Sequence, residues 1–303
     1  MIDFKPIKIQ DKELYEKLLF EGKERGCEYS FANLFLWGRQ KIAIIQDNIV
    51  LFSQFNRRTV YPLPLGDGDK KAVICQLIED SEQRGISLRI TGLDEEEMNF
   101  INQAFPNKFR FHCDRDSYDY VYDINDLADL SGKKYDGKRN HIKKFYSLFC
   151  DAVIEPITAD NIKDVEKMSD EWYAEKLEKD PESDFLMEKA ALSKAFNHYA
   201  ELGLEGIVIK SGDKILAFTM GSQISNNTFD IHFEKAVSNA QGAYAVINQA
   251  FAKHLREKYP QVIYLNREED MGIEGLRRAK LSYKPHHLVH KCWAHLMEEG
   301  YDY

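Results

Sequence analysis

The sequence lacks most of the features that mark a secreted, zinc-bound or membrane-spanning protein. Its 303 residues include only five cysteines, and no two of them form a CxxC pair. Scattered cysteines of this kind argue against a zinc site and against a disulfide framework. No apolar run approaches the roughly 20 residues that span a bilayer, and the first residues lack the basic-then-apolar order of a signal peptide. We therefore expect no transmembrane segment and a location in the reducing cytoplasm.

Common catalytic motifs are missing as well. The chain contains no G-x-x-x-x-G-K-[ST], no HExxH and no GxSxG. The histidines of the tail 286–295 have no acid or cysteine at a suitable spacing, so we expect no metal site. The net charge of −9 excludes a uniformly basic face for nucleic acid. What remains is a globular composition, 44% hydrophobic and 30% charged, in a length that suits two domains of about 150 residues.

The two halves of the chain predict the same order of elements. Each reads as a strand, two helices, a hairpin, a strand, a helix, a strand, a helix and a strand. Asp47 and Asn48 mark the hairpin turn of the first half, and 211–213 mark that of the second. The predicted fold class is α/β (α+β), with mixed central sheets flanked by helices. We expect domains at 1–130 and 150–303, joined by a basic linker helix at 131–149.

This order of elements resembles the GNAT acyltransferase fold, and a few longer segments carry a closer resemblance. They are "SFANLFLWG", "SYDYVYDINDLADLSGKKYDGKRNHIKKF", "HFEKA", "QGAYAVINQAF" and "YLNREEDMGIEGLRRAKLSYKP". In these segments the chain is similar to an uncharacterised bacterial family related to the cytoplasmic catalytic domain of phosphatidylglycerol lysyltransferases. That family resembles the tandem GNAT-like and Fem-type aminoacyltransferases. The resemblance implies two tandem GNAT-like domains and a transferase whose donor is an acyl-CoA or an aminoacyl-tRNA.

The segment "NAQGAYA" (239–245) occupies the place of the phosphate-binding loop of GNAT proteins, which reads Q/R-x-x-G-x-G/A. Gly242 fits this pattern, whereas Asn239 replaces the usual Gln or Arg and Tyr244 replaces a Gly or Ala. A tyrosine side chain would crowd a pyrophosphate that lies close to the backbone at a helix N-terminus. We therefore expect Gly242 and Tyr244 to contact the substrate and acetyl-CoA to bind weakly. The alternative is a tight turn into a buried helix.

The predicted strand "FDIHFEKA" carries three ionisable side chains. Alternation places Asp230, His232 and Glu234 on one face and apolar residues on the other. His232 and Glu234 are candidate catalytic residues, since either could serve as the general base of acyl transfer. The alternative is a partly exposed strand face.

Charged residues are dense where the strand "QVIYL" gives way to the next helix. Ligands of open α/β sheets bind at such strand ends. The lysyltransferase resemblance implies that Asp270 and Arg277 are catalytic. We expect Glu269, Asp270, Arg277 and Lys280 to form one polar cluster, and we assign substrate binding to Asn266, Arg267, Glu269 and Lys280. On this hypothesis Asp270→Asn and Arg277→Gln weaken ligand binding without lowering the melting temperature. The alternative is a set of salt bridges that fixes the loop.

The run "GKKYDGKRNHIKKF" (132–145) holds the basic residues of the expected linker. In a helix, Lys138, Arg139, Lys143 and Lys144 would form a basic stripe. The Fem-like resemblance implies that residues 133–144 contact a tRNA acceptor stem or an anionic headgroup, with Arg139 in substrate binding. The alternative is a solvated helix that pairs with nearby acidic residues.

Together these features predict acyl or aminoacyl transfer to an amine or hydroxyl. We expect the cleft in the second domain, between His232, Glu234 and the 266–280 loop. Two alternatives stay open: an acyl-CoA-dependent N-acyltransferase with an unusual phosphate loop, and a catalytically inert module that binds a small charged ligand.

Overall fold

The structure, a computed structural model, describes residues 1–38, 40–55, 58–179 and 185–297. These residues form two compact units. The first unit comprises 1–119, 269–277 and the chain from 288 on, and the second comprises 120–268 and 278–287. The chain thus passes between the units several times, whereas the expected division ran once through a linker at 131–149.

The first unit is built on a mixed sheet. Its strands run in the order β1-β2-β3-β4-β6-β15-β7, and β5 pairs with β3. The pair β4–β6 is parallel. The strands are β1 (Lys5–Pro6), β2 (Gln40–Ile45), β3 (Asn48–Phe55), β4 (Arg58–Pro62), β5 (Leu65–Gly66), β6 (Arg89–Leu93), β7 (Phe109–Cys113) and β15 (Cys292–Leu296). The helices are α1 (Lys12–Glu21), α2 (Phe31–Trp37), α3 (Lys70–Arg84) and α4 (Glu95–Ala104).

Side-chain caps fix where the helices of this unit begin. Ser30 accepts a hydrogen bond from the first turn of α2, and Asp69 does the same for α3. Asp94 and Glu97 form a capping box at α4. One apolar core joins the sheet to α3 and α4; it includes Val50, Tyr61, Val73, Leu77, Ile90 and Ile101.

The second unit repeats this plan. Its sheet runs in the order β14-β8-β13-β12-β11-β10-β9, and β12–β13 is the parallel pair. The strands are β8 (Asp119–Asp123), β9 (Val153–Pro156), β10 (Glu205–Ser211), β11 (Lys214–Gln223), β12 (Thr228–Ala236), β13 (Tyr264–Asn266) and β14 (His287–Val289). The helices are α5 (Ile124–Asp129), α6 (Asp136–Leu148), α7 (Ile162–Lys179), α8 (Phe185–Asn197), α9 (Ala243–Lys258) and α10 (Glu274–Leu281), the last of which spans both units.

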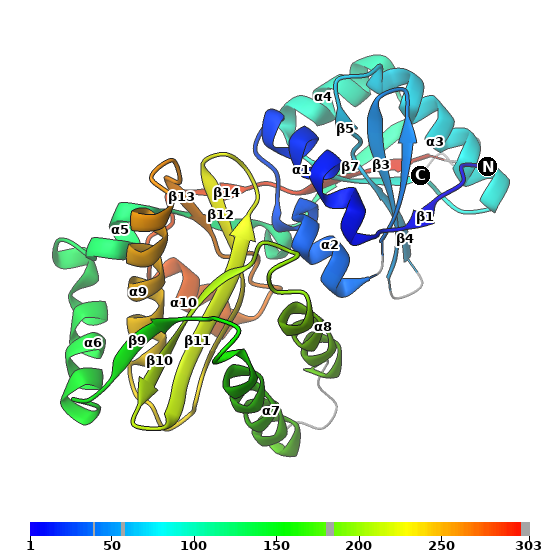
Figure 1. The fold of residues 1–303 in the computed structure, drawn as a ribbon. Coiled ribbons are helices and arrows are strands. Elements are labelled where there is room, and N and C mark those ends of the chain that lie inside the picture. Colours follow the sequence, from blue (N-terminus) through cyan, green and yellow to red (C-terminus); the bar gives the residue numbers. More distant parts are fainter. Residues whose placement is uncertain (39, 56–57, 180–184, 298–303) are drawn as a thin grey trace. The chain divides into compact units, whose positions relative to one another are not determined.

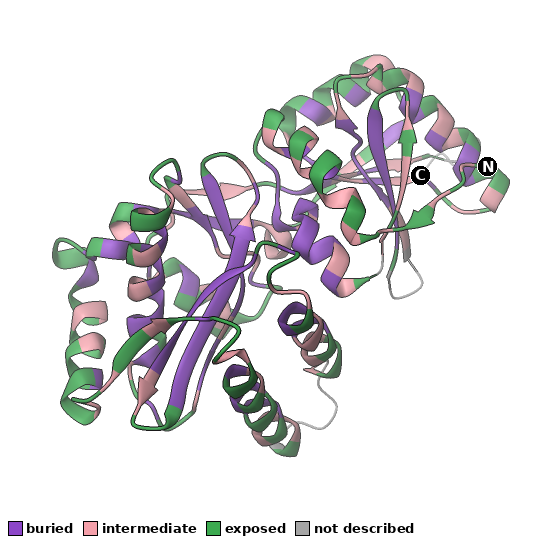
Figure 2. Ribbon diagram, viewed as in Figure 1, coloured by how far each residue is buried: buried purple, intermediate pink, exposed green. Residues whose placement is uncertain are grey.

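Helices cover both faces of the second sheet. The helix α9 packs on one face together with α5 and α6, while α7 and α8 lie on the other (Figure 1). The central strands β11 and β12 are buried along nearly their whole length (Figure 2). The face that carries Asp230 and His232 is therefore not an exposed strand face.

The predicted order of elements is confirmed, but each sheet takes one strand from the other half of the chain. The segment 109–124, which the sequence predicts as one extended stretch, forms β7 in the first unit, β8 mostly in the second, and at Ile124 the start of α5. The expected terminal strand 286–296 likewise divides into β14 and β15. In each sheet the exchanged strand lies next to the second strand of the parallel pair: β15 beside β6, and β8 beside β13. The two sheets are thus the same pattern built twice, with one strand exchanged each way.

The exchange corrects the expectation that the cysteines are unpaired. Cys113 on β7 and Cys292 on β15 face each other with their Cα atoms 4.3 Å apart, and they form a disulfide. They are separated by 179 residues, so their spacing in the sequence gave no sign of the pairing. Among the described residues, no helix combines the length and the apolar character needed to cross a membrane.

Candidate functional site

The parallel strands β12 and β13 separate after a short ladder. Their pairing ends at Asp230 opposite Asn266, where β13 stops. β12 continues to Ala236 and stays paired with β11 on its other side. From Ile231 on, the edge of β12 that faced β13 is therefore open. Openings of this kind are where open α/β sheets bind ligands.

A buried ion pair bridges this opening. The Arg267 guanidinium, directly after β13, donates to Glu234 Oε1 on β12 over 2.9 Å. Both side chains are nearly buried, at 13% and 12% exposure. Burial disfavours the charged guanidinium, but the Glu234 carboxylate together with Tyr122 and Tyr283 outweighs burial, and the pKa of Arg267 is raised. The opening thus holds a fixed positive charge beside a carboxylate.

Two tyrosines and a lysine complete the cluster. The guanidinium carbon of Arg267 lies 5.1 Å from the ring centre of Tyr283 and 5.9 Å from that of Tyr122. Lys138 reaches over from α6, with its Nζ 3.6 Å from the ring centre of Tyr283. Burial and the neighbouring Arg267 charge lower the pKa of Lys138 to about 8. This amine therefore changes protonation close to neutral pH.

Glu234 has unused hydrogen-bonding capacity. Its second oxygen, Oε2, is buried and makes no hydrogen bond to any residue that the structure describes. A buried carboxylate oxygen without a partner costs free energy, and native structures rarely leave one so unless a ligand or water satisfies it. We call Glu234, Arg267, Lys138, Tyr122 and Tyr283 the strand-opening cluster.

His232 belongs to a different group. The register of β11 and β12 shifts between Met220 and Gly221, which makes His232 the extra residue of a β-bulge. Its Nε2 lies 2.8 Å from Ser222 Oγ, and its Nδ1 lies 3.4 Å from Asp230 and 3.5 Å from Glu268. Because these contacts direct the ring toward Asp230, His232 is not part of the strand-opening cluster.

Asn266 and Lys280 hold the loop rather than line the opening. The Asn266 side chain accepts from the Glu268 amide over 2.7 Å. Lys280 is 8% exposed, and its Nζ donates to the carbonyls of Arg267 and Glu268. These contacts fix the backbone at Arg267 and Glu268.

The remaining acidic residues of the loop lie in the first unit, in separate contacts. Asp270 is fully buried and accepts two hydrogen bonds of 2.8 Å from Arg277, which also contacts Asp116. The hydrogen bonds that Arg277 donates to Asp270 and Asp116 raise the pKa of Arg277. Glu269 pairs instead with Lys291, at 2.6 Å. The expected single cluster of Glu269, Asp270, Arg277 and Lys280 is therefore divided, with Lys280 in the second unit.

The loop before α9 is tightly packed. Gly242 has φ +90°, and a Cβ there would lie 2.4 Å from the carbonyl oxygen of His141 on α6. This contact fits the alternative of a tight turn into a buried helix. Tyr244 is on the first turn of α9, and partial burial together with the Glu234 charge raises its pKa. Tyr244 is therefore a neighbour of the strand-opening cluster.

An open groove of 840 Å³ in the second unit runs from α7 to the end of β12. Its apolar lining includes Met168, Trp172 and Leu216, and its end is formed by Val237, Ser238 and Asn239. It is large enough for part of a small-molecule donor.

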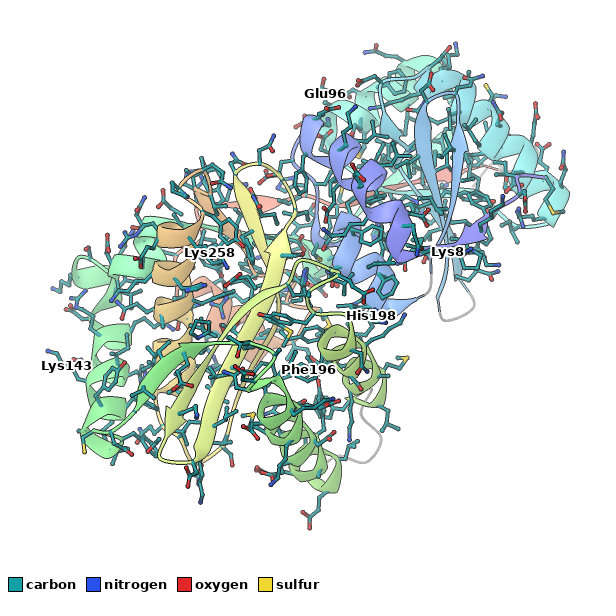
Figure 3. All side chains as sticks on the ribbon, viewed as in Figure 1. Lys8, Glu96, Lys143, Phe196, His198 and Lys258 are labelled. Atoms are coloured by element: carbon teal, nitrogen blue, oxygen red, sulfur yellow. A yellow bond between two sulfur atoms is a disulfide. The ribbon has the colours of Figure 1, made fainter. Side chains whose placement is uncertain are left out.

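The expected basic stripe on α6 is split. Arg139 donates to the carbonyls of Leu130 and Gly132 and pairs with Asp136. Lys138 turns to Tyr283, whereas Lys143 points outward from α6 (Figure 3). Arg139 thus stabilises the chain between α5 and α6 in this structure.

In the first unit, a tyrosine lies at the ends of the matching strands β4 and β6. The Tyr29 side chain is fully buried, and its hydroxyl donates to the carbonyls of Leu63 and Thr91, which follow and belong to those strands. At the corresponding strand ends the second unit carries the ion pair of Arg267 and Glu234, whereas the first carries the Tyr29 hydroxyl.

The sequence pointed to Glu234 through the alternation of a predicted strand, to Arg267 through the charged loop after the next strand, and to Tyr244 through the GNAT-like loop. It placed Lys138 only in the basic stripe and missed Tyr122 and Tyr283. These three come from segments far from β12 in the sequence, and no spacing rule connects them.

Comparisons with known proteins agree with this architecture. Residues 21–295 match the family model described as phosphatidylglycerol lysyltransferase, C-terminal. The crystal structure of a conserved protein of unknown function from Bacteroides thetaiotaomicron is 38% identical, with a TM-score of 0.92 over 98% of this chain and 100% of that one. L-PGS from Bacillus licheniformis is 18% identical, with a TM-score of 0.67 over 98% of this chain and 94% of that one, a likeness of fold.

A curated relative, an uncharacterized protein from Mycoplasmoides gallisepticum, is 26% identical over 57% of this chain. The match spans about half of that protein, 54% of its length.

Proposed function

Because the chain belongs to the family of phosphatidylglycerol lysyltransferase C-terminal domains, we propose that it transfers an acyl or aminoacyl group to an amine or hydroxyl acceptor. The strand-opening cluster of the second unit is the proposed active site. The observation that supports it most is the buried, unsatisfied Oε2 of Glu234 beside a fixed guanidinium and a lysine of lowered pKa.

In the proposed reaction, Glu234 is the general base. Its Oε2 accepts the N–H or O–H of the acceptor and takes that proton as the acceptor attacks the carbonyl carbon of the donor ester. The hydrogen bond from Arg267 to Oε1 holds the carboxylate in place and leaves Oε2 for the acceptor.

Arg267 and Lys138 supply the positive charge. The carbonyl oxygen of the donor becomes negative during the attack, and a buried guanidinium stabilises such charge strongly because little water screens it. Lys138, as the ammonium ion, gives its proton to the leaving oxygen when the ester bond breaks. A pKa of about 8 suits an acid that works near neutral pH.

We expect an aminoacyl-tRNA as the donor, in keeping with the family resemblance. Exposed Lys133, Lys143 and Lys144 on and before α6 would contact its phosphates. The acyl-CoA alternative is less favoured, because α6 fills the space beside Gly242 and Tyr244 replaces the small residue of the loop.

A ligand screen followed by a single variant tests the proposal. Melting of the wild type is measured with charged tRNAs, acetyl-CoA and free amino acids; a ligand at 100 times its dissociation constant stabilises by about 2.7 kcal/mol. Glu234→Gln should keep the shift given by the donor but lose at least about 100-fold in transfer rate. If the donor is bound but neither protein transfers it, the chain is a binding module.

A further inference from the structure

A second group of polar side chains lies in the second unit, outside the strand-opening cluster. It consists of Asp230, His232 and Glu268, and we call it the bulge cluster. Each residue directs one ligand-type atom inward, and these atoms all lie within 4.8 Å of one another. None of the three has a role in the proposed transfer.

The separations within the bulge cluster match the spacing of metal ligands. His232 Nδ1 lies 3.4 Å from Asp230 Oδ2 and 3.5 Å from Glu268 Oε1. Common N–H···O hydrogen bonds are shorter, about 2.7–3.2 Å. A tetrahedral ion with bonds of about 2.0–2.2 Å separates its ligand atoms by about 3.3–3.6 Å. Imidazole nitrogens and carboxylate oxygens are, in addition, both ligand types that bind zinc in proteins.

The surroundings fix the imidazole for this role. Ser222 Oγ lies 2.8 Å from His232 Nε2, the nitrogen that points away from the carboxylates. A hydroxyl that accepts from Nε2–H leaves the lone pair of Nδ1 directed at the cluster, and such outer contacts orient metal-binding histidines. The bulge at His232 aims the ring toward Asp230 and Glu268, and Gly221 opposite allows it, since a Cβ there would lie 2.0 Å from the Asp230 carbonyl oxygen.

A comparable cluster in the first unit is occupied by the ammonium group of a lysine. Cys27, Asp119 and Glu269 also bring their ligand-type atoms together. There the Nζ of Lys291 lies 2.6 Å from Asp119 and 2.6 Å from Glu269. The ammonium group occupies the place of a metal ion, so this first cluster carries no proposal. In the bulge cluster an imidazole faces the two carboxylates, and imidazole is itself a metal ligand.

We propose that Asp230, His232 and Glu268 bind one divalent transition-metal ion, of which Zn²⁺ is the first candidate. The fourth position is open to water or to a ligand atom. The ion would reach the site past Glu268, whose side chain is 28% exposed, whereas those of Asp230 and His232 are fully buried. This site is independent of the proposed transferase activity and is tested without it.

The test uses tag-free protein that has been stripped with a chelator and then titrated with ZnCl₂ by calorimetry. We expect one ion per chain for the wild type and an at least tenfold weaker affinity for Glu268→Gln, which keeps the size of a part-exposed loop side chain. Ser222→Ala should weaken affinity as well, by up to about 100-fold. His254→Gln is the matched control, because it removes another imidazole–carboxylate contact of the same unit, with Glu205 at 2.6 Å.

Two further readouts separate this site from background. Zn²⁺ should raise the melting temperature of the wild type and of His254→Gln but not that of Glu268→Gln. Co²⁺ should give the intense visible absorption of a four-coordinate site. The exposed thiols of Cys75 and Cys150 are the same in all these proteins, so they cannot produce the difference. Equal Zn²⁺ affinities for the wild type and Glu268→Gln, or no stoichiometric binding, would overturn the proposal.

Discussion

The environment of Lys138 differs from what its position in the sequence suggests. It belongs to a basic run that reads as a solvated helix, yet it lies over the Tyr283 ring and its pKa falls to about 8. It makes no ion pair with another described residue, so its charge is opposed by burial and by Arg267. A lysine of this kind makes folding stability depend on pH.

The sign of this dependence follows from the two pKa values. In the unfolded chain Lys138 titrates near 10.5, and in the folded chain near 8. Between these values the unfolded chain holds more protons, so stability rises with pH. Relative to Lys138→Met, the wild type should therefore gain stability from pH 7 to pH 10. Urea unfolding of both proteins at the two pH values measures this difference, and an unchanged difference would contradict the burial of Lys138.

Asp270 and Arg277 call for a different expectation from the one that the sequence suggested. Because Asp270 is fully buried and accepts two hydrogen bonds from the part-exposed Arg277, Asp270→Asn removes the charge partner of Arg277, and Arg277→Gln leaves a buried carboxylate without its charge partner. We now expect Asp270→Asn and Arg277→Gln to lower the melting temperature clearly. Thermal melts test this expectation. An unchanged melting temperature together with weaker ligand binding would instead support the catalytic role that the family resemblance implies for Asp270 and Arg277.

At the scale of elements, the packing of α6 against α9 defines the end of the loop at Gly242. This glycine combines φ +90° with a carbonyl oxygen 2.4 Å from where a Cβ would lie. Gly212 is also left-handed, with φ +55°, but has no atom within 4 Å of a Cβ. A substitution at Gly212 therefore measures the free-energy cost of the left-handed backbone without a steric clash.

We expect Gly242→Ala to lower the free energy of unfolding by about 1–3 kcal/mol through backbone strain. The clash of its Cβ with α6 should lower it further. Gly212→Ala should show the backbone cost alone. Chemical denaturation of the two variants gives the comparison. Equal losses would mean that α6 yields easily, and the loop could then open for a phosphate.

The strand β15 owes its place to pairing with β6 and β7 and to the Cys113–Cys292 disulfide. A bridge across so long a loop restricts the unfolded chain, and such bridges contribute about 2–4 kcal/mol. A reductant should thus lower the melting temperature of the wild type but have little further effect on Cys292→Ser. Cys75→Ser, which removes an exposed free thiol, is the control that should behave as the wild type.

At the scale of the whole molecule, local patterns revealed the order of elements but not their assignment to sheets. Caps such as Ser30 and Asp69, hairpin turns and apolar spacing act within a few residues, so they can be read from the sequence. The exchange of β8 and β15 depends on pairing between residues more than a hundred positions apart, which leaves no local trace. The same reason explains why Lys138 and Tyr283 were not connected with Glu234, whereas Arg267 was.

Because the fold pattern occurs twice, the first unit provides a control for the proposed catalytic role of Glu234. Each unit has a buried carboxylate–guanidinium pair: Glu234 with Arg267 in the second, and Glu97 with Arg25 at 2.7 Å in the first. In the first unit the Tyr29 hydroxyl bonds the ends of β4 and β6, whereas in the second the strand-opening cluster lies where β12 and β13 separate. Variants of Glu234 and Glu97 thus distinguish a catalytic role from a structural one.

The most direct test is single-turnover transfer from the donor found in the screen, by the wild type, Glu234→Gln and Glu97→Gln, each checked for folding by its melt. We expect a loss of at least about 100-fold for Glu234→Gln and nearly full activity for folded Glu97→Gln. Full activity of Glu234→Gln, or an equal loss in Glu97→Gln at unchanged melting, would contradict a catalytic site at the opening between β12 and β13.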